Sequence, residues 1–264
     1  MPQRSMASPL NVMDRDRRIV LAALVGIVAL AWGYLAYIVL RLPAMDMGAN
    51  AMAMMPARPW DAGYYLATLA MWMVMMVGMM VPSAAPTILL FDALQRQIEA
   101  GHRINHRPTM LFAAGYGIAW SAFSVAATTA QCGLSTAMLL SPMMAITSSV
   151  FAGLLLVAAG AYQFTPWKSA CLQHCRSPAE FLVKHRRTGR LGPLMMGLRH
   201  GVYCIGCCWA LMALLFMFGV MNLLWAAVLA IFVLVEKLAP AGVLLGRIGA
   251  ALMVCAGVAL IAFG

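Results

Sequence analysis

The sequence predicts an all-α protein, a polytopic transmembrane helical bundle with about seven spans. Two observations predict this fold. The chain has 264 residues, of which 64% are hydrophobic and 10% are charged, and a soluble domain needs more charge than this to solvate its surface. Several apolar runs also approach or exceed the roughly 20 residues with which a helix crosses a bilayer. Lipid offers no partners to backbone N–H and C=O groups, so these runs are expected to be helical.

The expected spans follow the apolar runs, and the sixth is shorter than the rest. The first run exceeds the roughly 7–15 residues of a signal-peptide core, so we expect it to be retained as a helix. Residues 1–18 before it are polar and basic and are interpreted as a cytoplasmic tail, and residues 19–264 as a single membrane-embedded domain. The spans are Ile19–Leu40, Gly63–Phe91, Thr109–Gln131, Met143–Pro166, Arg199–Phe218, Leu223–Val235 and Ala241–Phe263.

Lys and Arg residues gather in alternate loops and orient the bundle. The amino-terminal segment and the second and fourth loops hold most of them, whereas the loops of opposite parity hold only Arg41 and Arg58. An excess of Lys and Arg marks the cytoplasmic side. The amino terminus is therefore predicted inside and the carboxyl terminus outside. Because topology accounts for the net charge of +10, nucleic acid is not an expected partner, and the lipid bilayer is.

Five cysteines and one histidine are predicted to gather near the cytoplasmic rim of the bundle. One group opens the fifth span at spacings of four, three and one, which place its members on one face of a helix. The other pair lies in the preceding cytoplasmic loop and is one turn apart if that loop is helical. The first group is His200, Cys204, Cys207 and Cys208, and the pair is Cys171 and Cys175.

Thiolates at one depth of a membrane protein favour a soft metal ion. Cu(I) is the predicted ion, and Zn(II) in a tetrahedral cage is the alternative. Disulfides are not expected in the reducing cytoplasm. Two other interpretations stay open: an exposed thiol pair that exchanges electrons, and small buried packing residues. Cys132 and Cys255 stand apart from the group and are interpreted as packing residues.

Methionines form a thioether stripe along the second span. Met75 and Met79 share one row, and Met76 and Met80 share the next. Thioethers suit Cu(I), so the stripe is predicted as a secondary or transit site, with the filling of an irregular core as the alternative. Two prolines follow in the same helix, and transporters place binding sites at broken helices. An outer loop between residues 45 and 55 adds further methionines.

The remaining polar residues give weaker signals. Glu236 and Lys237 end the sixth span, where charges are often functional, but a pair that snorkels to the interface is an equally open interpretation. Four further histidines fall in basic loops and are expected to be solvated, with His174 the exception because two cysteines flank it. Gly242, Gly246 and Ala250 form a small-residue row that is expected to pack against a neighbouring helix. No catalytic triad, phosphate loop or dinucleotide fingerprint occurs, which favours a binding protein over an enzyme.

Three blocks of the sequence resemble a known bacterial family. They read MMVGMMVPSAAP at residues 75–86, YQFTPWK and CLQHCRSP within residues 162–178, and GLRHGVYCIGCCW at residues 197–209. The chain is similar here to the domain of unknown function 2182 family of integral membrane proteins. The resemblance implies a multi-pass protein of the bacterial inner membrane that binds a metal. It implies neither which metal nor an activity.

Together these observations predict a membrane protein that binds copper through clustered Cys and Met residues for metal handling or transport. A metallochaperone or another membrane protein is the expected protein partner. A membrane thiol-disulfide oxidoreductase and a scaffold subunit of a membrane complex are the alternative functions.

Overall fold

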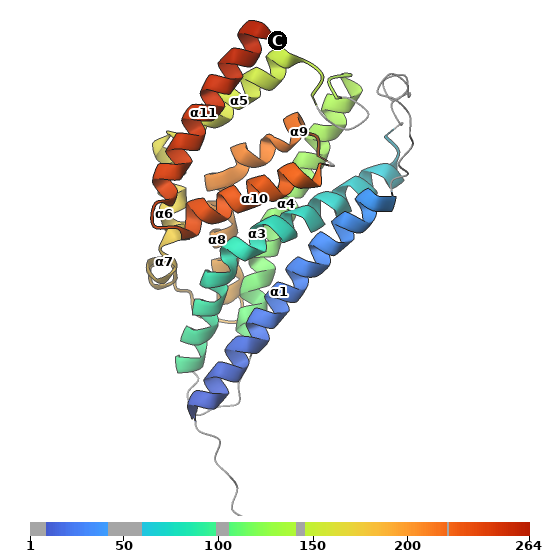
Figure 1. Ribbon diagram of the computed structural model, residues 1–264. Coiled ribbons are helices and arrows are strands. Elements are labelled where there is room, and N and C mark those ends of the chain that lie inside the picture. Colours follow the sequence, from blue (N-terminus) through green and yellow to red (C-terminus); the bar gives the residue numbers. More distant parts are fainter. Residues whose placement is uncertain (1–8, 42–59, 99–105, 141–145, 221) are drawn as a thin grey trace, which may run out of the picture.

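The computed structural model describes residues 9–41, 60–98, 106–140, 146–220 and 222–264, in which every regular element is a helix. This confirms the predicted all-α bundle (Figure 1). The Met-rich outer loop lies outside the described residues. In chain order the helices are α1 (Pro9–Arg41), α3 (Ala62–Ile98), α4 (Arg107–Thr136), α5 (Ser149–Gln163), α6 (Pro166–Arg176), α7 (Pro178–Lys184), α8 (Gly192–Ala213), α9 (Leu215–Phe218), α10 (Leu223–Leu238) and α11 (Gly242–Phe263).

Five stretches of the described chain are helical, long and apolar enough to cross a membrane, and α5 with α6 makes a sixth if that bent pair is one span. The five lie in α1, α3, α4, α8 with α9, and α11. With 16 residues, α10 is shorter than the roughly 20 residues of a full crossing. The total of seven spans therefore remains a prediction. The first described residues and the carboxyl terminus lie at opposite ends of the bundle (Figure 1).

Several predicted boundaries differ from the helices observed. α1 begins at Pro9, inside the predicted tail, and α5 begins at Ser149. The difference that matters most for the candidate site concerns α8, which begins at Gly192 rather than at Arg199. Its opening residues, Gly192 to Leu198, are apolar and include a proline in the first turn, a position that suits proline. The charged Arg199, where the sequence predicts the span to begin, lies inside the helix.

Glycines allow α4 and α8 to touch along their length. A Cβ on Gly115 would overlap the backbone of Leu194, and a Cβ on Gly197 would overlap the backbone of Phe112. Small residues of this kind let helix backbones approach closely in membrane proteins. This close contact fixes the position of α8 relative to α4.

Small residues also join α11 to its neighbours. A Cβ on Gly160 of α5 would lie 2.8 Å from the carbonyl oxygen of Ala250, and a Cβ on Gly246 would overlap the side chain of Glu236 on α10. The row that begins at Gly242 thus packs against other helices, as predicted.

The chain bends by 63° between α5 and α6. Thr165 has φ −71° and ψ 147°, the extended conformation that a following proline imposes. Its hydroxyl accepts a hydrogen bond from the Lys168 N–H at 3.3 Å and so caps α6. The bend turns α6 across the bundle, where it packs against α8 and α10. This turn brings the second cysteine pair toward the first group.

Proline also leaves a mark on α3, which continues through Pro82 and Pro86. Proline has no N–H, so Pro82 leaves the Gly78 carbonyl without its helical donor. The indole N–H of Trp32 on α1 donates a hydrogen bond to that oxygen at 3.2 Å. This hydrogen bond, made to a carbonyl that Pro82 leaves without a helical donor, joins α1 to α3.

Candidate metal centre

The polar face of α8 forms the centre of the candidate site. His200, Cys204, Cys207 and Cys208 are all buried, each with an exposed fraction of 2% or less. The spacing that predicted one shared face is thus confirmed by their common burial. Because α8 begins at Gly192 and its apolar stretch continues to Phe218, these cysteines lie near the middle of the helix. The prediction that they lie at the cytoplasmic rim was wrong, because it rested on a helix start at Arg199.

Helix α6 adds the second pair of cysteines. The Cys175 thiol is buried and lies close enough to Cys204 and Cys207 to interact electrostatically with their thiols. Cys171 is half-buried, and a Cβ on Gly206 would lie 2.7 Å from its sulfur. The two stretches of chain therefore meet, as predicted, with Cys175 inside the group and Cys171 at its edge.

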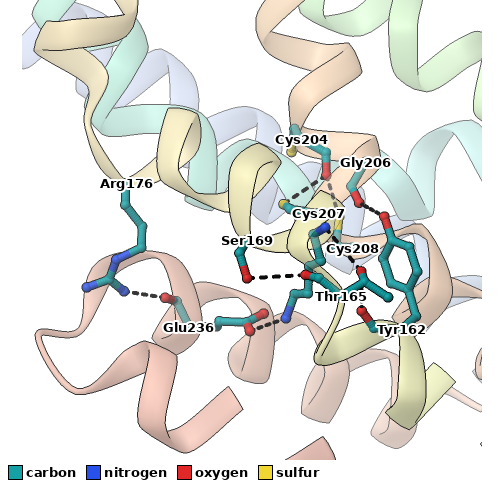
Figure 2. Close-up of polar contacts among 10 residues, drawn as sticks. Tyr162, Thr165, Ser169, Arg176, Cys204, Gly206, Cys207, Cys208 and Glu236 are labelled. Atoms are coloured by element: carbon teal, nitrogen blue, oxygen red, sulfur yellow. Dashed lines mark hydrogen bonds and ion pairs between the residues drawn. The ribbon is translucent and has the colours of Figure 1, made fainter. Parts of the chain in front are cut away.

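Hydrogen bonds join α5 to α8 and α6 to α10. The Tyr162 hydroxyl, at the end of α5, donates to the Gly206 carbonyl of α8 at 2.5 Å. Arg176 of α6 donates to the backbone carbonyl of Glu236 on α10 at 2.5 Å. Figure 2 shows both contacts, with the thiols of Cys207 and Cys208 directed at the Cys204 carbonyl. The start of α6 is therefore fixed through α5 and its end through α10.

Helices α3 and α4 close the group from the remaining side. The sulfur of Met80 lies 3.9 Å from that of Cys208. The Tyr116 hydroxyl lies 3.2 Å from the sulfur of Cys204 and donates to the Met80 carbonyl at 3.2 Å. Sequence analysis missed Tyr116, because no local pattern around it marks a site and its role depends on the α4–α8 packing.

The four methionines of the stripe are all buried, but they differ in what they contact. Met80 contacts a cysteine of the group. Met79 lines an apolar pocket of about 280 Å³ between α1, α3 and α10, together with Trp32 and Pro82. Met75 and Met76 belong to the general hydrophobic core. The structure thus brings Met80 to the thiols, and the described contacts do not place the other three there.

Two charged residues of α10 lie inside the bundle, each with an exposed fraction of 4%. The Lys237 ammonium lies 3.0 Å from the Cys204 sulfur and 3.1 Å from the Ser83 hydroxyl. Glu236 forms a buried ion pair with Lys168 of α6. The interpretation that Glu236 and Lys237 snorkel and pair with each other was wrong, because each has a partner on another helix. Ser83 and Lys168 were not foreseen as parts of the site.

The thiols of Cys207 and Cys208 are bonded to the helix backbone. Both donate to the Cys204 carbonyl, at 3.1 Å and 2.9 Å respectively. Within the described part of the chain, no three His, Cys, Asp or Glu side chains are already arranged as a metal-binding group. Binding an ion therefore requires Cys207 and Cys208 to rotate about their Cα–Cβ bonds, a change between ordinary side-chain rotamers.

His200 lies one turn before Cys204 on the same face. Its ring packs near those of Phe112, Tyr116 and Phe181, with centroids 6.1, 5.7 and 5.1 Å away. Its Nδ1 atom is buried and has no hydrogen-bond partner. Buried polar atoms usually have a partner, so this imidazole is the group at the site with an unused nitrogen.

The loop histidines differ from the expectation that they are solvated. His106 lies 3.7 Å from the Asp92 carboxylate, His174 is half-buried, and His185 is buried. Burial lowers the pKa of His185, against the opposing effect of its hydrogen bond to the Phe181 carbonyl. His102 lies outside the described residues. His185 is therefore held as a neutral imidazole near neutral pH.

Comparison with known proteins identifies the family. Residues 69–260, well over half of the chain, match the model of the family described as PpoB2, copper chaperone. No curated protein and no solved structure matches the chain. That description agrees with copper, the ion that the thiol chemistry favours. The resemblance of the three sequence blocks to the domain of unknown function 2182 family remains a prediction. This chain belongs to the PpoB2 family of copper chaperones.

Proposed function

We propose that this protein is a membrane-embedded chaperone that holds Cu(I) between α3, α6 and α8. The ligands are drawn from Cys175, Cys204, Cys207 and Cys208, with Met80 and His200 beside them and Cys171 at the edge. The observation that carries the proposal is the close approach of the α6 cysteines to α8, where Cys175 is buried with Cys204, Cys207 and Cys208 and the Cys171 sulfur lies against Gly206. Thiolate and thioether sulfur are the ligands that Cu(I) prefers, and zinc is the alternative ion.

The charges around the thiols support this assignment. Several thiolates around one Cu(I) ion leave a net negative charge, which is costly in a buried site. The Lys237 ammonium, 3.0 Å from the Cys204 sulfur, offsets that charge. The neighbouring Glu236 carboxylate is already neutralised by Lys168, so it does not compete for the Lys237 ammonium.

Burial favours metal binding over the alternative of thiol exchange. A redox-active cysteine must present an exposed thiolate to its substrate, but Cys204, Cys207 and Cys208 each have an exposed fraction of 1%. A small ion passes between packed helices more readily than another protein's disulfide does. A scaffold role would give these side chains no function beyond packing, and it leaves the buried Lys237 beside a thiol unexplained.

The proposal places the protein in the bacterial inner membrane, with the positively charged ends of its helices in the cytoplasm. Its partners are the bilayer, the copper ion, and a membrane protein or metallochaperone that exchanges copper with it. The Met75, Met76 and Met79 side chains are proposed as a transit path toward Met80. Holding and delivery of the ion need only the site, whereas transport also needs alternating access.

Copper content of the purified protein tests the proposal. The full chain in mild detergent is loaded with Cu(I), freed of loosely bound metal, and assayed by elemental analysis. We expect the wild type to retain copper and the variants Cys204→Ser and Cys207→Ser to retain little. The matched controls are Cys132→Ser and Cys255→Ser, since these thiols lie apart from the group. Equal copper content in all five proteins would overturn the proposal.

A further inference from the structure

A pair of histidines lies at the carboxyl-terminal ends of α6 and α7, outside the thiol group. The rings of His174 and His185 have their centroids 5.7 Å apart. A nitrogen–metal bond to an imidazole is about 2.0–2.1 Å, so the centres of two imidazoles that share an ion lie up to about 6 Å apart. The separation therefore matches that of two rings on one ion.

The hydrogen bonds of both rings leave the same nitrogen unused. His174 Nδ1 lies 2.8 Å from the Ala170 carbonyl oxygen, and His185 Nδ1 lies 3.1 Å from that of Phe181. A carbonyl oxygen only accepts, so Nδ1 carries the proton in each ring and Nε2 keeps its lone pair. A metal-binding histidine commonly donates its other ring N–H to a carbonyl in this way, which fixes the ring and its tautomer.

Aromatic neighbours hold both rings in position. Tyr203 of α8 stacks on His174 with centroids 4.1 Å apart and planes 6° from parallel. Phe181, itself buried, stacks on His185 with centroids 4.9 Å apart. A site whose ligands are fixed by packing loses less conformational freedom when the ion binds.

A small pocket opens beside one of the two rings. Its volume is about 70 Å³, and it is lined by His174, Phe181, Glu180 and Lys184, among others. His185 is buried and is not among the lining residues, so the shared ion would lie between the pocket and the His185 ring. Glu180 and Lys184 are both exposed, so the pocket lies at the surface of the bundle. The Glu180 carboxylate adds a negative charge that offsets Lys184 and the nearby Arg199. His174 directly precedes Cys175, so an ion here is adjacent in sequence to the thiol group.

We propose that His174 and His185 form a second copper site, which receives or releases the ion on the way to and from the buried thiols. Neutral imidazole binds both copper and zinc, and two nitrogen ligands hold Cu(I) less tightly than several thiolates do. The site rests on the proposed function only for the identity of the ion. It adds an exchange point that a partner reaches from outside the bundle, whereas the thiols themselves are buried.

X-ray absorption on the full chain in detergent tests this inference. The wild type is loaded with one and then two equivalents of Cu(I). We expect mainly sulfur coordination at one equivalent, and imidazole scattering to appear with the second. The variants His174→Gln and His185→Gln should each weaken the second equivalent at least tenfold and lose its imidazole signal, while the first equivalent is retained. His106→Gln is the matched control, because its ring lies beside the Asp92 carboxylate instead of beside another histidine.

The outcomes separate this inference from the proposed function. The histidine site is overturned if no second equivalent binds. It is also overturned if the second equivalent shows no imidazole scattering and both glutamine variants still bind it. The thiol site stands in either case. Imidazole-bound copper in a protein whose copper content does not change with Cys204→Ser retains the histidine site and overturns the thiol site. Loss of the imidazole signal in His106→Gln as well would mean that the effect is not specific to the pair, and would also overturn the inference.

Discussion

The ammonium nitrogen of Lys237 lies 3.0 Å from the sulfur of Cys204, inside the helical bundle. The two residues belong to different helices, α10 and α8, and each is almost fully buried. A positive charge beside a thiol is the feature that separates this group of cysteines from ordinary packing residues. In the proposed function it links copper binding to the position of α10.

Replacing Lys237 by Leu should weaken Cu(I) binding by roughly 10–100-fold, the range found when an outer partner of a metal ligand is lost. Leucine removes the charge that offsets the thiolates and adds no new sulfur ligand. Competition with a chromophoric Cu(I) chelator measures the change. Lys184→Leu, at an exposed position, is the control and should bind as the wild type does. Unchanged affinity in Lys237→Leu would show that the ammonium plays no part in binding.

Replacing Glu236 by Gln should destabilise the protein by roughly 3–5 kcal/mol, because it leaves the buried Lys168 without its ion-pair partner. Thermal unfolding in detergent measures the loss. The double variant Glu236→Gln with Lys168→Met removes both charges, and it should recover much of the lost stability. A double variant no more stable than the single one would show that the pair is not the source of the effect.

Replacing Met80 by Leu should weaken Cu(I) binding by less than the loss of Cys208 does, since a thioether is a weaker ligand than a thiolate. Leucine preserves the volume and the apolar character of the side chain. The neighbouring Met79→Leu is the control, because Met79 lines the pocket beside Trp32 instead of contacting a thiol. Chelator competition distinguishes the two variants, and an equal loss in both would count against a specific role of Met80.

Replacing Gly115 by Ala should destabilise the α4–α8 contact by about 1–3 kcal/mol, the usual cost of overpacking. The added methyl group would overlap the backbone of Leu194 and push α8 away from Tyr116. Gly117→Ala on the same helix is the control, because nothing lies within 4 Å of a Cβ there. Alanine in a helix is about 1 kcal/mol better than glycine, so this control should be neutral or stabilising. Thermal unfolding of the two variants gives the comparison.

Local patterns were sufficient for several features. Helical periodicity alone placed His200, Cys204, Cys207 and Cys208 on one face, and they share one buried face in α8. The row of small residues that begins at Gly242 predicted close packing against a neighbouring helix. A Cβ on Gly246 would indeed overlap the side chain of Glu236. These predictions succeeded because a helix repeats regularly, so residues close in sequence have a known relation in space.

The depth of the site was not predictable from the same patterns. Arg199 marked the membrane boundary in the sequence, but it sits on α8 with its guanidinium 5.9 Å from the ring centroid of Tyr203. A long charged side chain can lie along the apolar surface while its charged end reaches outward. A charge in the sequence therefore does not fix where a helix begins, and the thiols lie further from the start of α8 than predicted.

The sequence by itself determined the all-helical class, the shared face of α8, and the sulfur-rich chemistry that favours copper. Only the tertiary structure decided that Cys175 lies inside the group and Cys171 at its edge, that Lys168 is the partner of Glu236, and that Lys237 faces Cys204. The reason is physical: residues within one helix are related by its fixed pitch, but residues on different helices, such as the pairs 33 and 68 positions apart at Lys237 and Glu236, meet only where helices pack. That packing depends on the bend at Thr165–Pro166 and on the glycine contacts between helices. These features lie in different segments, so the pattern of one segment does not predict their combined effect.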